Sequence, residues 1–96
     1  MSKLGFIYIV TNRRNVTLYT GVTSNLVTRI EQHKCGFYNG FSKRYRTHQL
    51  VWFDCCNNIK EAIVFEKMIK RRSRSWKIKL IESLNPRWRD LSEEWR

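Results

Sequence analysis

The feature that most restricts the fold is a pair of short β-rich runs joined by a polar, turn-prone insert. The runs read FIYIV (6–10) and VTLYTGV (16–22), and the insert between them contains Asn12-Arg13-Arg14-Asn15. β-Branched and aromatic residues favour strands, and asparagine favours turns. The sequence therefore predicts a β-hairpin from about Gly5 to Val22.

Side chains alternate across a strand, so each run has one aliphatic face and one face that carries a tyrosine, Tyr8 or Tyr19. If the aliphatic faces pack inward together, both tyrosines lie on the same side of the hairpin. A four-residue loop, 12–15, sets Tyr8 opposite Tyr19. The same register sets Phe6 opposite Gly21, which leaves a gap where a backbone or a phosphate can approach closely.

A helix is expected directly after the second run. Ser24 or Asn25 can cap it, and residues 26–35 contain neither proline nor glycine. Arg29 and His33 are four residues apart, which places them about 6 Å apart along one helical face. Two tyrosines, an arginine and a histidine can therefore converge on one spot.

The remainder predicts one strand and two further helices. The apolar run Leu50–Cys55 predicts a third strand, whose neighbour in the sheet the sequence does not settle. Asn57 or Asn58 can cap a second helix, and a third is expected from about Arg74 to Ser83. The predicted fold is a single α/β (α+β) domain, residues 1–96. It has a three-stranded, mostly antiparallel sheet flanked by three helices in the order β-β-α-β-α-α.

The charge of the chain indicates a polyanionic partner. Nineteen Lys and Arg against eight Asp and Glu give a net charge of +11, and nucleic acid is the leading candidate. Seven basic residues and no acidic one lie between Lys67 and Lys79, and aromatic and basic residues interleave in 36–47. Both segments could instead be solvated surface. The residues expected to contact nucleic acid are Lys43, Arg44, Lys70, Arg71 and Arg74.

Several function classes are disfavoured. Three cysteines, two of them adjacent, suit reduced structural thiols better than a disulfide, and no CxxC spacing suggests zinc. The absence of a long apolar segment, signal peptide or lipidation motif argues against a membrane partner. The protein is expected to be intracellular, in a bacterial-type cytoplasm. The sequence leaves its oligomeric state open and favours a monomer.

Phe6-Ile7-Tyr8, the run from Tyr19 to Leu26 (YTGVTSNL), and Arg29 with His33 together resemble the GIY-YIG nuclease superfamily, particularly its small single-domain members. Further segments extend the resemblance over nearly the whole chain. They are Phe41–Tyr45 (FSKRY), the helix around Glu66, and Asn85-Pro86-Arg87-Trp88. Phe6 replaces the first glycine of the family's name motif, and Thr20 replaces the isoleucine of the second triplet. Both tyrosines, the arginine and the acidic residue are present.

The resemblance implies a metal-dependent endonuclease that hydrolyses DNA phosphodiester bonds. In that reaction Tyr8 or Tyr19 deprotonates or positions a water, and Arg29 contacts the scissile phosphate. Glu66 holds one Mg²⁺ or Mn²⁺. His33 relays a proton or holds a tyrosine through a hydrogen bond, and Asn85 closes the site.

The residues themselves leave alternatives open. Glu66 could form a salt bridge with Arg29 or Lys70, His33 could be a buried helix histidine, and Asn85 could cap the preceding helix. A nucleic-acid-binding module of the same fold with little or no catalysis is the second function, and a basic adaptor for an acidic protein is the third.

We expect five side chains, Tyr8, Tyr19, Arg29, His33 and Glu66, to line one concave, partly exposed site. A structure with Glu66 on the face opposite Arg29 would favour the binding module.

Overall fold

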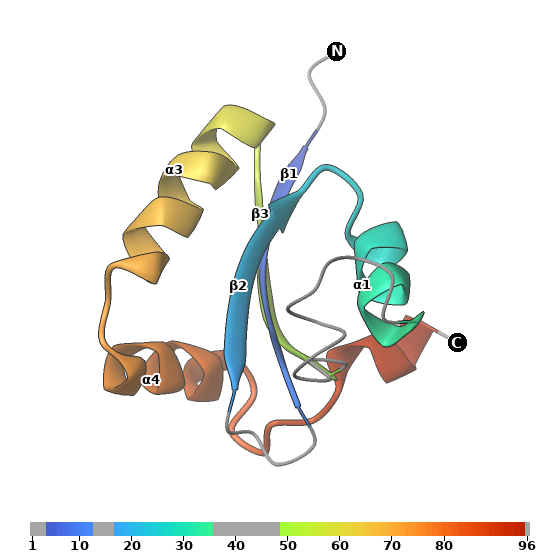
Figure 1. Cartoon of the computed structure of the whole chain (residues 1–96), viewed down its shortest axis with the longest axis vertical. Coiled ribbons are helices and arrows are strands. Elements are labelled where there is room, and N and C mark those ends of the chain that lie inside the picture. The colour runs from blue at the N-terminus through green and yellow to red at the C-terminus, as the bar shows by residue number, and fades with distance from the viewer. Residues whose placement is uncertain (1–3, 13–16, 36–48, 96) are drawn as a thin grey trace.

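Three antiparallel strands form a sheet with helices on both of its faces (Figure 1). The computed structural model describes residues 4–12, 17–35 and 49–95. The strands are β1 (Gly5–Thr11), β2 (Leu18–Thr23) and β3 (Gln49–Cys56). The helices are α1 (Leu26–Cys35), α3 (Ile59–Lys70) and α4 (Arg74–Leu84), and a short 3₁₀ helix, η1 (Leu91–Trp95), follows. This order confirms the predicted fold class.

The central strand of the sheet is β1. The strand order is β2-β1-β3, so the hairpin partner β2 forms one edge and β3 forms the other. The sequence left the neighbour of the third strand open, and the structure places it beside β1. Because β1 has a strand on each side and helices on each face, Ile7, Tyr8, Ile9 and Val10 are all fully buried.

The predicted alternation of faces is confirmed. Ile7 and Ile9 belong to a core cluster with Ala62 and Ile69 of α3 and Ile81 of α4. On the other face, Tyr8 and Val10 pack with residues of α1 and β3, namely Leu26, Ile30 and Leu50. Figure 1 shows the same division, with α3 and α4 on one side of the sheet and α1 on the other.

The predicted register of the hairpin is wrong by two residues. Tyr8 pairs with Gly21 instead of Tyr19, and Phe6 pairs with Thr23 instead of Gly21. A shift of two residues keeps every side chain on its predicted face, so the hydrophobic alternation cannot exclude it. The last pair is Thr11 with Leu18, and the connection is therefore longer than the four residues expected.

Side-chain caps fix where three helices begin. Asn25 Oδ1 accepts a hydrogen bond from the Thr28 N–H at 3.1 Å, and Asn58 Oδ1 accepts one from the Glu61 N–H at 2.9 Å. These contacts select Asn25 over Ser24 and Asn58 over Asn57 as the capping residues. Ser73 Oγ likewise accepts from the Trp76 N–H at 3.2 Å, at the start of α4.

The chain after α4 is fastened to the sheet and to α1 through one carboxylate. The two oxygens of Asp90 accept hydrogen bonds from Lys34 Nζ at 2.6 Å and from the Leu50 N–H at 3.2 Å. The hydroxyl and the backbone N–H of Ser92 also donate to it. We call this arrangement the Asp90 clasp, since it joins α1, β3 and η1.

The structure contains three free cysteines, Cys35, Cys55 and Cys56. None of the helices within residues 4–12, 17–35 and 49–95 has the length and apolar character needed to cross a membrane.

Candidate active site

Three rings from three different elements form an aromatic cluster on the α1 face of the sheet. Tyr8 comes from β1, Tyr19 from β2 and His33 from α1. The His33 ring centre is 5.4 Å from the ring centre of each tyrosine, and the two tyrosine ring centres are 6.4 Å apart. The predicted convergence of these three side chains is therefore correct.

A buried hydrogen bond joins Tyr8 to His33. The Tyr8 hydroxyl oxygen lies 2.9 Å from His33 Nε2. The hydroxyl donates when Nε2 carries no proton and accepts when it does, so this pair can pass a proton in either direction. His33 thus combines two of the roles considered for it, because it is fully buried and it also holds a tyrosine.

Gly21 lies directly against the Tyr8 ring. A Cβ atom at Gly21 would overlap the Tyr8 hydroxyl and Cζ, and it would lie 2.9 Å from Cε1. The gap that the sequence analysis assigned to a phosphate or a backbone is therefore filled by the phenol. Gly21 makes room for this ring and thereby sets its position.

The cluster is less exposed than predicted. Tyr8 and His33 are fully buried, whereas Tyr19 is partly exposed. The expectation of a partly exposed site is therefore wrong for two of the three rings. β1 is the central strand and α1 covers this face of it, so a side chain in the middle of β1 has no route to solvent. Of the two phenols, Tyr19 is the one that solvent reaches.

Arg29 extends from α1 to the edge of the sheet. It lies one helical turn before His33, and its side chain is partly exposed. Its Nη1 donates to the backbone carbonyl of Val22 in β2 over 3.5 Å. The guanidinium is therefore held beside the edge strand that carries Tyr19.

Glu66 comes from the opposite layer. It lies on α3, and Ala62 and Ile69 of that helix pack into the core on the face away from the tyrosines. The chain after β3 crosses to the other face of the sheet before α3 begins (Figure 1). The convergence of Glu66 with the tyrosines, Arg29 and His33 on one site stays a prediction.

The surroundings of Glu66 are nevertheless specific. It follows Ala62 by four residues and precedes Ile69 by three, so it lies on the side of α3 that faces the sheet. Its side chain is only 13% exposed, and Oε1 lies 3.3 Å from Lys70 Nζ. Of the two partners considered for this carboxylate, the structure shows Lys70. α3 packs on β1 and on β2, the strand whose carbonyl Arg29 contacts.

A single carboxylate of this kind fits a magnesium-type metal. Within the described residues, no group of three or more His, Cys, Asp or Glu side chains could hold a metal ion by itself. Mg²⁺ is commonly bound through only one or two carboxylates together with waters and substrate phosphates. Glu66 offers such a carboxylate at a place where a cation, the Lys70 ammonium, already lies.

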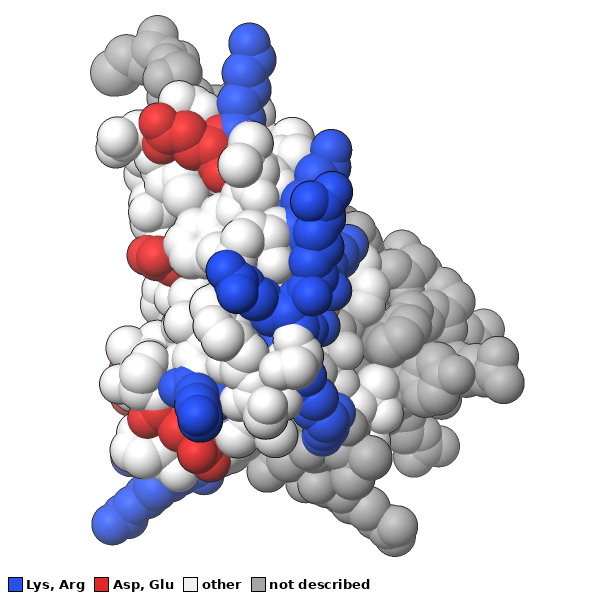
Figure 2. Space-filling model, turned by 90° about the vertical axis from the view of Figure 1, so that its left-hand side faces the viewer, with Lys and Arg blue, Asp and Glu red and all other residues white. Residues whose placement is uncertain are grey.

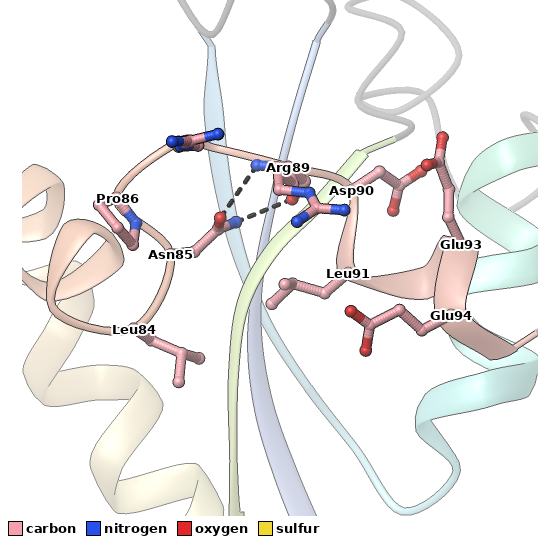
Figure 3. A pocket seen from close by; sticks show the side chains of 9 residues that line it. Leu84, Asn85, Pro86, Arg89, Asp90, Leu91, Glu93 and Glu94 are labelled. Atoms are coloured by element: carbon pink, nitrogen blue, oxygen red, sulfur yellow. Dashed lines mark hydrogen bonds between the residues drawn. The ribbon is translucent and has the colours of Figure 1, made fainter.

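Asn85 lies at the other edge of the sheet. Its amide nitrogen donates to the carbonyls of Val51 in β3 at 3.1 Å and of Arg89 at 2.8 Å, and its oxygen accepts from the Arg89 N–H. Figure 3 shows Asn85 in a hollow between the end of α4 and η1. These contacts support a role for Asn85 in ending α4 and in tethering the chain after it to β3, the edge opposite β2. The closing of the catalytic site by Asn85 stays a prediction.

Three of the five residues predicted to contact nucleic acid lie in the described part of the chain. Lys70, Arg71 and Arg74 are exposed at the end of α3 and the start of α4. Figure 2 shows Lys and Arg side chains gathered in a column down this face, with Asp and Glu nearer its margin. Lys43 and Arg44, like the whole segment 36–48, lie outside the described residues.

Sequence reasoning missed the Asp90 clasp and the hollow beside Asn85. The acidic residue before a short apolar tail was the available signal for the clasp. Its partners Lys34 and Leu50 are 56 and 40 residues away, so spacing could not indicate them.

Comparison with known proteins gives one consistent result. A family model described as the GIY-YIG catalytic domain matches residues 4–79. A UPF0213 protein of Pediococcus pentosaceus is 37% identical over 78 residues, covering 81% of this chain and 82% of the relative. A UPF0213 protein of Syntrophus aciditrophicus is 34% identical over 87 residues, covering 90% of this chain and 97% of the relative.

A solved structure shares the fold. The solution NMR structure of a UPF0213 protein from Bacillus halodurans aligns with a TM-score of 0.58 and 22% identity, covering 94% of this chain and 95% of the other. At this level of identity the likeness concerns the fold alone.

Proposed function

Because the chain belongs to the GIY-YIG family, within the nuclease superfamily, we propose that it is a metal-dependent endonuclease that hydrolyses DNA phosphodiester bonds. The observation that carries the proposal is the cluster of Tyr8, Tyr19 and His33, with the Tyr8 hydroxyl on the imidazole and Arg29 one turn away. A packed core alone does not require a buried Tyr–His hydrogen bond beside an arginine at the sheet edge.

The aromatic cluster would supply the proton chemistry. Hydrolysis of a phosphodiester needs a water nucleophile, a group that takes its proton, and positive charge where negative charge develops. A free phenol with a pKa near 10 is ionised only about one part in a thousand at pH 7. Lowering that pKa by three units takes about 4 kcal/mol, which nearby cationic groups can provide.

The two tyrosines would divide the work. Tyr8 is buried and hydrogen-bonded to His33, so it orients the imidazole and does not itself meet solvent. Tyr19 contacts the same imidazole and is partly exposed, so it is the phenol that can position or deprotonate a water. Arg29 would then hold the scissile phosphate, with its guanidinium already at the β2 edge.

Glu66 would hold the metal ion. When bound, Mg²⁺ or Mn²⁺ would neutralise charge on the phosphate and stabilise the leaving oxygen. Lys70 Nζ lies 3.3 Å from Oε1 of this carboxylate, so the ammonium and the ion would compete for Glu66. Exposed Lys70, Arg71 and Arg74, with Lys43 and Arg44, would contact other phosphates of the DNA.

A specific observation favours a second candidate function, a binding module with little or no catalysis. Glu66 lies in the opposite layer from the tyrosines and is paired with Lys70. Binding needs only the basic face, whereas hydrolysis also needs Arg29 and Glu66 to act on the same phosphate. The two functions therefore differ in what these two residues contribute.

Nicking of supercoiled plasmid in the presence of Mg²⁺ or Mn²⁺ tests the proposal. Arg29→Ala should lower the rate about a hundred- to a thousandfold, because it removes charge stabilisation of roughly 3 to 4 kcal/mol, while DNA affinity falls far less. Glu66→Ala should abolish the metal dependence without unfolding the domain. Glu61→Ala, which removes an exposed carboxylate from the same helix, is the matched control and should leave the rate unchanged.

The binding-module function would replace the endonuclease if wild type and both variants gave the same nicking rate as a blank. Binding of each variant to the same plasmid has to be measured alongside, so that a loss of rate is separated from a loss of affinity.

A further inference from the structure

A groove lies on the outer side of α3, where the helix ends and the turn toward α4 begins. It is lined by Val64, Lys67, Met68, Arg71 and Arg72. This is the face shown in Figure 2, and it belongs to the layer opposite the aromatic cluster. We call it the α3 groove.

The floor of the α3 groove is apolar. Val64 is 69% exposed, which makes it the most exposed large hydrophobic residue in the described part of the chain. Met68, one turn later, packs its inner side against the core and contributes its remaining surface to the groove. Lysine and arginine side chains surround both residues. The apolar surface between them is in contact with water unless a partner covers it.

The rim of the groove is cationic. Lys67 and Arg71 are four residues apart on one helical face, about 6 Å from each other along the axis. The Arg72 guanidinium carbon lies 5.3 Å from the centre of the Trp76 ring, a cation–π contact that restrains this side chain. Among the described residues no carboxylate lines the groove, and the Glu66 carboxylate of the same helix faces the sheet.

We propose that the α3 groove binds a single-stranded segment of nucleic acid. Lys67, Arg71 and Arg72 would contact its phosphates, and an unstacked base would lie on Val64 and Met68. The nature of the partner rests on the proposed function. The preference for a single strand rests on the floor, because a duplex presents phosphates outward and keeps its bases stacked, and so makes no use of an exposed apolar surface.

The position of the groove defines what the substrate contains. The groove lies in the α3 and α4 layer, and the aromatic cluster lies in the α1 layer. A segment in the groove is therefore distinct from the phosphodiester at the tyrosines. A nucleic acid that reaches both places carries an unpaired segment next to the part that is cut.

Fluorescence anisotropy in EDTA tests the groove without requiring chemistry. The probes are a labelled oligothymidylate and a blunt duplex of equal length. Lys67→Gln with Arg71→Gln is compared with Lys60→Gln and Lys79→Gln, an exposed pair outside the groove that removes the same charge. The groove pair should weaken oligothymidylate binding at least tenfold and reduce its salt slope by about 1.4, whereas the control pair should weaken it less than threefold.

Val64→Ser tests the apolar floor of the groove. Because the Val64 side chain is exposed, this substitution should not unfold the domain. It should weaken oligothymidylate binding about threefold to fivefold and leave duplex binding unchanged. Equal losses for the two pairs of variants, or equal losses for single strand and duplex, would overturn the proposal. If the protein does not nick plasmid but the binding results are as expected, the proposed endonuclease activity is refuted and the proposed binding of single strands in the α3 groove is not.

Discussion

At the scale of single residues, Gly21 decides where the Tyr8 phenol lies. The ring occupies the place where any side chain at position 21 would be. We predict that Gly21→Ala displaces the ring, breaks its hydrogen bond to His33 and lowers the free energy of unfolding by about 1 to 3 kcal/mol, the usual cost of overpacking. Urea unfolding measures the loss, and the plasmid-nicking rate should fall with it.

A double-mutant cycle isolates the contact between these two residues. In a Tyr8→Leu background the overlapping atoms are gone, so adding Gly21→Ala should cost clearly less than it does in wild type. Equal costs in the two backgrounds would mean that the glycine is required for its backbone conformation and does not position the ring.

At the scale of elements, the sequence predicted which strands and helices form and which faces they bury. Those properties depend on local periodicity, and the alternation in β1 and β2 is unambiguous. The register depended on the length of the turn, which alternation does not determine, since Tyr8 opposite Gly21 and Tyr8 opposite Tyr19 bury the same faces. The neighbour of β3 was likewise open, because the long connection before it permits either strand.

The Asp90 clasp makes the stability of the domain depend on pH. Burial acts to raise the pKa of Asp90, but hydrogen bonds from Lys34, from Ser92 and from the backbone N–H of Leu50 outweigh it and leave the pKa below its ordinary value of 3.8. A carboxyl with a lowered pKa stabilises the fold fully above its ordinary value. That contribution is lost as pH falls through the lowered value.

Asp90→Asn should therefore lower the free energy of unfolding at pH 7 by about 3 kcal/mol, because it removes the negative charge that the half-buried Lys34 ammonium contacts at 2.6 Å. The difference between the variant and wild type should begin to shrink below about pH 4 and should close only as pH falls through the lowered pKa of Asp90. Urea unfolding between pH 2.5 and pH 7 provides the measurement. Glu93→Gln removes an exposed carboxylate from the same segment, and its free energy of unfolding should follow that of wild type at every pH. If the difference between Asp90→Asn and wild type were the same at every pH, the pH dependence would not come from Asp90.

At the scale of the whole molecule, the candidate site was predictable to the extent that it is local. Tyr8, Tyr19, Arg29 and His33 lie within one hairpin and the helix after it, so face and spacing sufficed to bring them together. Glu66 lies on α3, and the face of the sheet that α3 covers depends on where β3 joins the sheet. No periodicity within α3 carries that information, and the burial of Tyr8 depends in the same way on β1 being central.

The charge of the molecule is also a property of its whole surface. The net charge of the chain is +11, and the Lys and Arg residues on α3, the turn after it and α4 contribute to it and form the column in Figure 2. Phosphate contacts displace condensed counterions from DNA, so the affinity should depend steeply on salt. With five contacts to duplex DNA, the slope of log K against log salt should be about −4 to −5.

Reversing Lys70, Arg71 and Arg74 to Glu should weaken binding to every duplex sequence alike and make the salt slope shallower, because these exposed side chains would contact phosphates and read no bases. Titrations of two unrelated duplex sequences at three salt concentrations measure both quantities. The three positions lie at the end of α3 and the start of α4, away from the aromatic cluster, so His33 and both tyrosines should keep their wild-type NMR signals. An unchanged affinity in the triple variant would show that this face is only solvated, and a loss confined to one of the two sequences would mean that it reads bases.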